Sequence, residues 1–232
     1  MKALMQNAPL LLSSIIDHAA KWHGEQEIVS LMGKGVLHRE TYKEAQLRAK
    51  KLALALKRMG VKKGEVVATM AWNHYRHFES WYGVSGMGAV VHTLNPRLFP
   101  DQLIYIMNHA GAALLLLDVC FLPLIEKLAP HLPKIRGYVF FCGGDEMPEH
   151  GLQNASCYEE LLEAESGDYE WEKLDENDAC GICYTSGTTD EPKGVVYSHR
   201  SNVLHCLATL NNDVMGISAC DVVMPVVPMF HA

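Results

Sequence analysis

The sequence predicts an α/β fold in which a mostly parallel β-sheet is flanked by helices. Short apolar runs alternate with longer segments of helical periodicity, which is the pattern of repeated strand–helix–strand units. The run Ala-Ala-Leu-Leu-Leu-Leu at 112–117 has no polar position, so it suits a strand that is buried on both faces. Such a strand needs helices on both sides of its sheet.

The N-terminal part is expected to form two helices separated by a β-hairpin. The predicted elements are a helix at 9–23, strands at 27–32 and 36–38, and a helix at 41–60. Thr41 and Glu44 have the spacing of a capping box, in which each side chain accepts a hydrogen bond from the other residue's backbone N–H. The second helix should therefore begin directly after Thr41, and Gly60 should end it.

Strands and helices then alternate as far as residue 142. Strands are expected at 66–72, 89–94, 112–117 and 137–142, and helices at 77–87, 99–110 and 121–128. The polar, acidic segment 143–178 is expected to be a solvated connection with one short helix at 158–164. We place a subdomain boundary near its end, so that 1–175 form a first α/β subdomain and 176–232 form the start of a second.

The last part of the chain is expected to contain a β-hairpin, a helix and a final strand. Apolar residues at 181–184 and 194–198 predict the two strands of the hairpin. Ser201 is placed to cap a helix that runs to Leu210. Residues 221–227 are rich in valine, so we expect a strand there, with the sequence Pro-Met-Phe-His at its end.

Composition and charge fit a packed soluble protein and argue against several other classes. Hydrophobic residues make up 49% of the chain and charged residues 20%, which is usual for a globular domain. A formal net charge of −7 argues against a nucleic-acid-binding surface. The longest apolar stretch, 112–125, is interrupted by Asp118 and Pro123, so it predicts no transmembrane helix, and the N-terminus has no signal-peptide pattern. We therefore expect a cytoplasmic protein.

Cysteines are scattered along the chain, and their odd number, seven, fits a reducing compartment better than a disulfide framework. Cys180 and Cys183 have the spacing of a redox or metal-binding pair, but no second pair accompanies them. Alternation along a strand would place their side chains on opposite faces of the sheet. We interpret both as buried small apolar residues.

The segment 184–195, Tyr-Thr-Ser-Gly-Thr-Thr-Asp-Glu-Pro-Lys-Gly-Val, is the strongest candidate for a binding site. It contains side-chain hydrogen-bond donors and a glycine that lets a ligand approach the backbone. The candidate binding residues are Thr185, Ser186, Gly187, Thr188, Thr189 and Lys193. Many short donors and one cation suit the phosphates of a nucleoside triphosphate. A Walker A loop is excluded, because Lys193 is followed by Gly194 and valines rather than by Ser or Thr and a helix. A Ser/Thr-rich surface turn is the alternative, which the fixed order of residues between two apolar strands does not favour.

With Asp190 as the one departure, this segment resembles the hallmark loop Tyr-Thr-Ser-Gly-Thr-Thr-Gly-x-Pro-Lys-Gly-Val of the adenylate-forming superfamily. That superfamily contains acyl-CoA synthetases, luciferases and the adenylation domains of peptide synthetases. The resemblance implies that the loop contacts the phosphates of ATP and that the Ser186 hydroxyl lies near Mg²⁺. Asp190 adds a negative charge where the family has glycine, so we expect it to weaken ATP binding.

Further segments resemble the fatty-acyl-CoA synthetase branch of this superfamily. They are residues 94–98, 101–109, 194–201 and 221–231. The last contains Pro-Met-Phe-His, which resembles a family motif whose aromatic and histidine residues line the acyl and thioester channel, so His231 is expected there. The implied substrates are a medium- or long-chain fatty acid, ATP with Mg²⁺, and CoA. In the implied reaction the fatty carboxylate attacks ATP to give an acyl-adenylate, and CoA then takes the acyl group.

The family's sequences continue well beyond the length of this chain. A later glutamate that assists Mg²⁺, a ribose-binding aspartate, and a C-terminal domain with a catalytic lysine have no counterpart here. The resemblance therefore implies the N-terminal portion of a larger enzyme, inactive by itself and with no catalytic residue assigned. The alternatives are another adenylate-forming enzyme, such as an aryl-CoA ligase or a luciferase-like protein, and a non-catalytic nucleotide-binding module. Exposed apolar edges would favour association, and a homodimer is one expected form.

Overall fold

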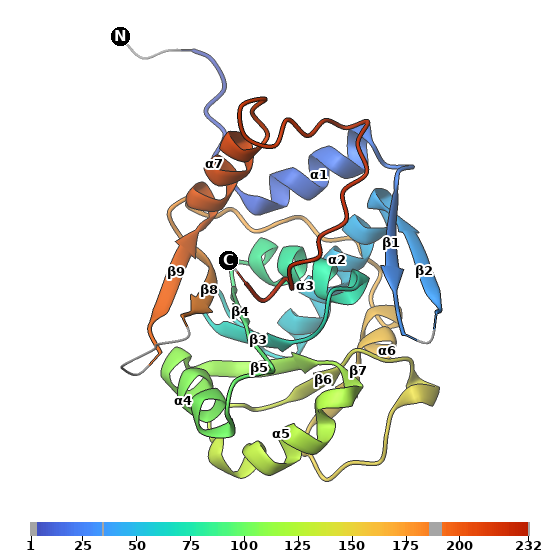
Figure 1. Cartoon of the computed structure of the whole chain (residues 1–232), viewed down its shortest axis with the longest axis vertical. Helices are drawn as coiled ribbons and strands as arrows, with labels where there is room; N and C mark the ends of the chain where they lie inside the picture. Colours follow the sequence, from blue (N-terminus) through green and yellow to red (C-terminus); the bar gives the residue numbers. More distant parts are fainter. Residues whose placement is uncertain (1–3, 34, 186–191, 232) are drawn as a thin grey trace.

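The computed structural model describes residues 4–33, 35–185 and 192–231, which form a helix-covered sheet and a separate small hairpin (Figure 1). The large sheet has the strand order β7-β6-β5-β3-β4-β8-β9. Its strands are β3 (Val66–Met70), β4 (Val90–Thr93), β5 (Ala112–Leu117), β6 (Tyr138–Phe140), β7 (Ala155–Cys157), β8 (Ala179–Tyr184) and β9 (Gly194–Ser198). Neighbouring strands from β7 to β8 are parallel, and β9 is antiparallel to β8. The predicted α/β fold with a mostly parallel sheet is confirmed.

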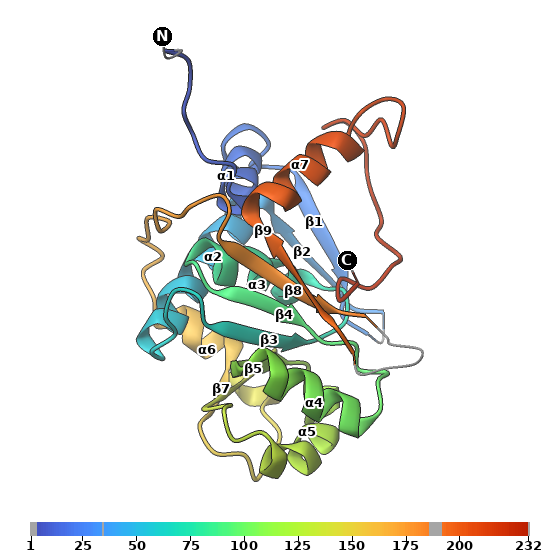
Figure 2. The same cartoon turned by 90° about the vertical axis from the view of Figure 1, so that its left-hand side faces the viewer.

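Helices cover both faces of this sheet. They are α1 (Leu12–Trp22), α2 (Tyr42–Arg58), α3 (Tyr75–Gly86), α4 (Pro100–Ala110), α5 (Leu122–Leu128), α6 (Tyr158–Glu163) and α7 (His199–Thr209), with short 3₁₀ turns η1 (Val119–Phe121), η2 (Ala129–His131) and η3 (Gly144–Glu146). Figure 2 shows α2, α3 and α6 on one side of the sheet and α4 and α5 on the other. Among the described residues, no helix combines the length and the apolar character that crossing a membrane requires.

Strand β5 shows how the residue pattern sets the packing on both faces. All six of its residues are buried, as the run of apolar residues predicts. Leu114 and Leu116 belong to the core cluster that contains Leu52 of α2. Leu115 belongs to the second cluster, which contains Ile106 of α4. Because successive side chains of a strand point to opposite faces, this one strand contributes to the core under both helical layers.

The N-terminal hairpin and the helix after it also agree with the sequence-based prediction. Strands β1 (Glu27–Leu31) and β2 (Leu37–Thr41) pair in an antiparallel arrangement. At the start of α2, Thr41 Oγ1 accepts a hydrogen bond from Glu44 N at 3.2 Å, and Glu44 Oε2 accepts one from Thr41 N at 2.7 Å. The capping box is therefore present, and it satisfies two backbone donors at the helix N-terminus.

Two predictions in the C-terminal part are wrong. Helix α7 is capped by Ser198 rather than Ser201, because Ser198 Oγ accepts a hydrogen bond from Ser201 N at 3.1 Å. No strand forms at 221–227, and all of these residues are exposed. A valine-rich sequence favours extended backbone, but a strand also needs a neighbouring strand to pair with, and the described residues provide none at this place.

The connection between β6 and β8 is more ordered than the predicted solvated segment. It contains β7, which the sequence did not predict, as well as α6, and it buries Tyr169 and Leu174. The ring of Trp171 packs so closely on Gly86 of α3 that a Cβ at position 86 would overlap it. Strand β8, which follows this connection, pairs with β4 in the same sheet, and the subdomain boundary near residue 175 stays a prediction.

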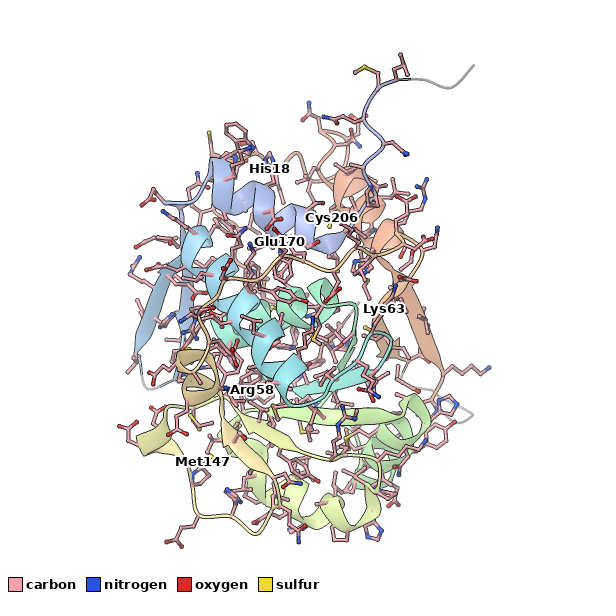
Figure 3. The ribbon with its side chains drawn as sticks, turned by 180° about the vertical axis from the view of Figure 1, so that it is seen from behind. His18, Arg58, Lys63, Met147, Glu170 and Cys206 are labelled. Carbon is pink, nitrogen blue, oxygen red and sulfur yellow. The ribbon has the colours of Figure 1, made fainter. Side chains whose placement is uncertain are left out.

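Basic residues on the rear face of the molecule neutralise part of this acidic connection. Figure 3 shows Arg58 and Lys63 on that face. The Arg58 guanidinium lies 3.1 Å from Glu165, and the Lys63 ammonium lies 2.7 Å from Asp178. Asp178 directly precedes β8, whereas the candidate loop follows the end of β8. The end of the acidic stretch therefore lies at the edge of the sheet opposite the loop.

A cluster of charged and phenolic side chains connects α2, α3 and α6 in the interior. Arg48 Nε donates a hydrogen bond to Glu79 Oε1 at 2.6 Å, and the Tyr158 hydroxyl donates one to Glu79 Oε2 at 2.6 Å. Arg76 Nε donates to Glu159 Oε1 at 2.6 Å, and Arg48 Nη1 lies 3.0 Å from Glu159 Oε2. Glu79 is completely buried, so its charge requires the Arg48 guanidinium beside it.

Glu40 of β2 lies beside this cluster and is only 4% exposed. Within the described part of the chain, no donor reaches either of its carboxyl oxygens. Burial, together with the negative charge of Glu79, raises the pKa of Glu40 to about 9. Burial also raises the pKa of Glu79, but the hydrogen bonds that Glu79 accepts from Arg48 and Tyr158 oppose this shift by favouring its ionised form. The Arg48 guanidinium lies 2.6 Å from Glu79 but 3.7 Å from Glu40, so it favours the charge on Glu79, and we assign the proton at neutral pH to Glu40, which can donate it to Glu79.

Replacing Glu40 with glutamine should raise the free energy of unfolding more at pH 8 than at pH 5. In the wild type, the unfolded chain loses this proton near the ordinary value of 4.5, while the folded chain keeps it up to about 9. Wild-type stability therefore falls as the pH rises through this window. Glutamine has no proton to lose and can donate the same hydrogen bond. Urea denaturation at the two pH values measures the effect.

Glu44→Gln is the matched control for this experiment. Hydrogen bonds from the backbone and hydroxyl of Thr41 lower the pKa of Glu44, so it is ionised at both pH values and its replacement should cost the same at each. A stability gain of Glu40→Gln that is equal at pH 5 and pH 8 would contradict the protonated state of Glu40.

Candidate functional site

The candidate loop joins β8 to β9 at the carboxyl edge of the parallel sheet. Tyr184 and Gly194 are paired across the hairpin, and Thr185 N donates a hydrogen bond to the Lys193 carbonyl at 3.0 Å. The loop therefore connects two strands, as the sequence predicts. Thr185 and Lys193, at its two ends, are exposed. The predicted positions Ser186, Gly187, Thr188, Thr189 and Asp190 lie outside the described residues.

Tyr184, the last residue of β8, is held on several sides. Its hydroxyl shares a 2.6 Å hydrogen bond with His109 Nδ1 in the last turn of α4. Its ring lies against the backbone of Gly194, where a Cβ would come within 2.9 Å of the ring. The His92 ring lies 5.1 Å from the Tyr184 ring. Glycine at position 194 thus allows the Tyr184 ring to pack against the backbone of β9. This contact helps to hold Tyr184 at the end of β8, where the loop begins.

His92 and His109 were not identified as site residues from the sequence. Burial lowers the pKa of His92 to about 3, so its imidazole is neutral beneath Tyr184. His109 does lie in the segment 101–109 that resembles the fatty-acyl-CoA synthetase branch, and that resemblance was the available signal. Neither contact can be derived from spacing, because both join residues that are distant in the sequence.

A cavity of about 300 Å³ lies beside the base of the loop, at the ends of β4 and β8. Its lining includes Thr93, Tyr184, Thr185, Tyr197, Phe230 and His231. The structure thus brings together Thr185 from the candidate loop and His231 from the Pro-Met-Phe-His sequence. Lys193 does not line the cavity, and its side chain is exposed. Ligands of open parallel sheets bind at this carboxyl edge, so the cavity is the best candidate for the binding site.

Phe230 anchors the cavity wall that carries His231. The Phe230 side chain is buried, and its carbonyl accepts a hydrogen bond from Thr93 Oγ1 at 3.3 Å. The His231 ring is exposed and lies 4.8 Å from the Phe230 ring. His231 N donates to the Pro228 carbonyl at 3.0 Å. This arrangement presents the imidazole to the cavity from a fixed backbone.

The cysteine pair of β8 is structural. Cys180 and Cys183 are both buried, as the sequence-based interpretation states. Cys180 packs in a small cluster with Leu12 and Val203, whereas the Cys183 Sγ lies 3.5 Å from Thr93 Oγ1 beside the cavity. Their side chains therefore point to different surroundings. In the part of the chain that the structure describes, no three His, Cys, Asp or Glu side chains are grouped to hold a metal ion.

The parallel sheet, with a hairpin loop and a cavity at its carboxyl edge, has the architecture of the α/β domains whose ligands bind at the strand ends. Comparison with known proteins gives the family. The chain belongs to the AMP-binding enzyme family, whose profile matches residues 16–232. The family expected from the loop is therefore confirmed.

Several curated relatives match nearly the whole chain. A 3-methylmercaptopropionyl-CoA ligase of Ruegeria lacuscaerulensis is 47% identical over 98% of this chain and 42% of its own length. A medium-chain-fatty-acid–CoA ligase of Ectopseudomonas oleovorans is 45% identical with the same coverage. A long-chain-fatty-acid–CoA ligase of Thermus thermophilus is 44% identical over 98% of this chain and 40% of its own. The chain thus spans less than half the length of these relatives.

Solved structures support the same fold. A long-chain-fatty-acid-CoA ligase from Archaeoglobus fulgidus superimposes with a TM-score of 0.82 at 24% identity, over 99% of this chain and 44% of the other. The N-terminal domain of FACL13 from Mycobacterium tuberculosis gives a TM-score of 0.79 at 23% identity, over 95% of this chain and 52% of the other. At these identities the likeness concerns the fold.

Proposed function

We propose that this chain is the N-terminal part of an ATP-dependent, AMP-forming acyl-CoA synthetase that activates a fatty acid. The observation that carries the proposal is that Thr185 of the candidate loop and His231 of the Pro-Met-Phe-His sequence line the same cavity. Membership of the AMP-binding family and the fatty-acid–CoA ligase relatives support the reaction class. We expect the chain by itself to be inactive, because the relatives use more than twice its length.

In the proposed reaction, an oxygen of the fatty carboxylate attacks the α-phosphorus of Mg·ATP. A new P–O bond gives the acyl-adenylate, and the bond to the β-phosphate breaks with release of pyrophosphate. The CoA thiol then loses its proton and attacks the acyl carbonyl, and AMP leaves. The substrate supplies the nucleophile, so the protein needs no nucleophilic side chain. Lys193 and the loop donors would stabilise the charge that develops on the leaving pyrophosphate.

Magnesium enters this scheme as part of the Mg·ATP substrate. The described residues offer no group of carboxylates or histidines to hold it, and Ser186, the hydroxyl proposed to lie near it, is outside them. A single hydroxyl is also a weak magnesium ligand without a carboxylate. We therefore assign the ion no further role among these residues.

The acid specificity can be tested with the complete protein in a pyrophosphate-exchange assay. The panel contains medium- and long-chain fatty acids, an aromatic acid, and 3-methylmercaptopropionate, which is named in two of the relatives. Exchange that depends on a fatty acid supports the proposal. Preference for the aromatic acid would support an aryl-CoA ligase, and preference for the short thioether acid would change the substrate class. Binding of Mg·ATP without any exchange would favour a non-catalytic nucleotide-binding module.

Replacing Asp190 with glycine is expected to tighten Mg·ATP binding about 5-fold. Two like charges about 4 Å apart repel by about 1 kcal/mol in water and more in a partly buried site. The neighbouring Glu191 occupies a variable position of the family loop, so Glu191→Gln is the matched control, with a smaller expected change. Calorimetric titration of the complete protein measures both constants. An unchanged dissociation constant for Asp190→Gly would contradict the expected repulsion between Asp190 and ATP.

We further propose that the protein acts in the cytoplasm and associates as a homodimer. Val196 on β9 and Leu207 on α7 are exposed apolar side chains, which either the rest of the complete protein or a second subunit would cover, and we propose the second subunit. Sedimentation velocity of the complete protein separates a dimer from a monomer, and a monomer at all concentrations would contradict the second part.

A further inference from the structure

The backbone between α7 and Phe230 makes few hydrogen bonds to the rest of the molecule before it reaches the cavity, one of them from Gln26 Nε2 to the Ala219 carbonyl at 3.0 Å. Residues 221–227 are exposed, with Val222 at 99%. Figure 1 shows that the chain after α7 crosses the molecule and ends beside β4. Since no strand forms here, another feature must determine where the segment meets the sheet and hence where Phe230 and His231 lie.

The side-chain amide of Asn73 is that feature. Its Oδ1 accepts a hydrogen bond from Met229 N at 2.7 Å. Its Nδ2 donates to the Val227 carbonyl at 2.9 Å and to the Pro225 carbonyl at 3.2 Å. The carbonyl and both N–H groups of one side chain are therefore used on a segment that lies more than a hundred residues away in the sequence. Only an amide of this length offers that combination of one acceptor and two donors at one place.

Asn73 is itself held firmly at the end of β3. The Asp118 carboxylate, which follows β5, accepts a hydrogen bond from Trp72 N at 2.8 Å and contacts His74 Nε2 at 2.8 Å. The residues on either side of Asn73 are thus fixed to the neighbouring strand. The Trp72 ring also lies 6.4 Å from the Phe230 ring, on the same side as the tethered segment.

We propose that Asn73 is a positioning residue that sets the place of Phe230 and His231 at the cavity. The Asn73 amide binds the backbone at 225–229, and the Thr93 hydroxyl donates a hydrogen bond to the Phe230 carbonyl that follows it. Asn73 does not line the cavity, so it acts through these two residues rather than on a ligand. We call the three hydrogen bonds between the Asn73 amide and residues 225–229 the tether. The tether does not depend on the proposed function, whereas its expected effect on the kinetics of the protein rests on that function.

Hydrogen exchange of the backbone amides tests the tether without any activity. In Asn73→Ala, the Met229 amide loses its acceptor, and its exchange should become about 10-fold faster or more, together with its neighbours at 226–231. Asn108→Ala is the matched control, because Asn108 Nδ2 in α4 also donates to a distant backbone carbonyl, that of His131, at 2.9 Å. That variant should leave 226–231 unchanged. Exchange at Met229 that is the same in Asn73→Ala and the wild type would overturn the proposal.

Kinetics of the complete protein test what the tether does. Asn73→Asp keeps the acceptor for Met229 N but loses both donors, so it should raise the KM for the fatty acid about 10-fold while the dissociation constant of Mg·ATP stays within about 2-fold. Equal losses in both constants would indicate general destabilisation and overturn the positioning role. If the exchange result is as expected but the wild type activates no acid, the tether stands and the proposed function fails.

Discussion

Replacing Lys193 with alanine is expected to lower the kcat/KM of the complete protein for ATP by about 10²- to 10³-fold. Removal of one well-placed donor from an electrostatic site has an effect of this size, because the donor acts most strongly on charge that develops in the transition state. Only the backbone carbonyl of Lys193 takes part in the pairing with Thr185, so the hairpin keeps this hydrogen bond in the variant. Steady-state kinetics with varied ATP provide the measurement.

Two further variants make this prediction specific. Lys193→Arg keeps the positive charge and should retain more activity than Lys193→Ala. Lys63→Ala removes another exposed lysine, which pairs with Asp178 at the opposite edge of the sheet, and should change kcat/KM by less than about 3-fold. Activity of Lys193→Ala that matches Lys63→Ala would show that the ammonium has no role in the reaction.

The largest effect on stability is expected from Arg48→Ala, which should reduce the free energy of unfolding by about 3–5 kcal/mol. Arg48 is the guanidinium that faces the fully buried Glu79, so its removal leaves a carboxylate charge inside the protein without a cation. Urea denaturation followed by circular dichroism measures the change. The magnitude comes from the uncompensated charge, not from the strength of the ion pair itself.

A variant of a surface ion pair and a double variant of the buried pair separate the cost of the uncompensated charge from the strength of an ion pair. Arg39 and Glu27 are also 2.6 Å apart, but their side chains are 54% and 51% exposed, so Arg39→Ala should cost about 0–1 kcal/mol. Combining Arg48→Met with Glu79→Gln removes both charges and should recover much of the stability lost in Arg48→Ala. A loss below about 1 kcal/mol in Arg48→Ala would mean that Glu79 is not charged in the folded protein.

Those elements that depend on local residue patterns were predictable from the sequence. The apolar run at 112–117 predicts a strand between two helical layers, and β5 is buried in this position in the structure. The capping box of Thr41 and Glu44 is a local hydrogen-bond arrangement, so its spacing alone reveals it. The hairpin around the candidate loop was predicted for the same reason, since two apolar runs flank a polar turn.

The errors come from interactions between distant parts of the chain. Strand β7 has only three residues, and its pairing with β6 rather than its composition makes it a strand. The valine-rich segment at 221–227 has the composition of a strand but meets no partner within the described residues. The acidic connection was expected to be solvated because sequence alone does not show that Arg58 and Lys63 face it.

The candidate site was predictable in its residue types but not in its supporting contacts. Thr185 and His231 were identified from the motifs that contain them, and the structure places both at one cavity. The hydrogen bond between His109 and Tyr184 and the hydrogen bonds of Asn73 join residues far apart in the sequence, so no local pattern indicates them. The contacts of Ser186, Gly187, Thr188 and Thr189 with phosphate stay predictions.

The central claim is that the loop between β8 and β9 holds the β- and γ-phosphates of ATP. Its most direct test compares the dissociation constants of Mg·ATP and AMP for the complete wild-type protein and for Lys193→Ala, since AMP lacks those two phosphates. We predict that the variant binds Mg·ATP at least about 10-fold more weakly and binds AMP as the wild type does. An equal loss for both nucleotides, or no loss for Mg·ATP, would contradict the claim.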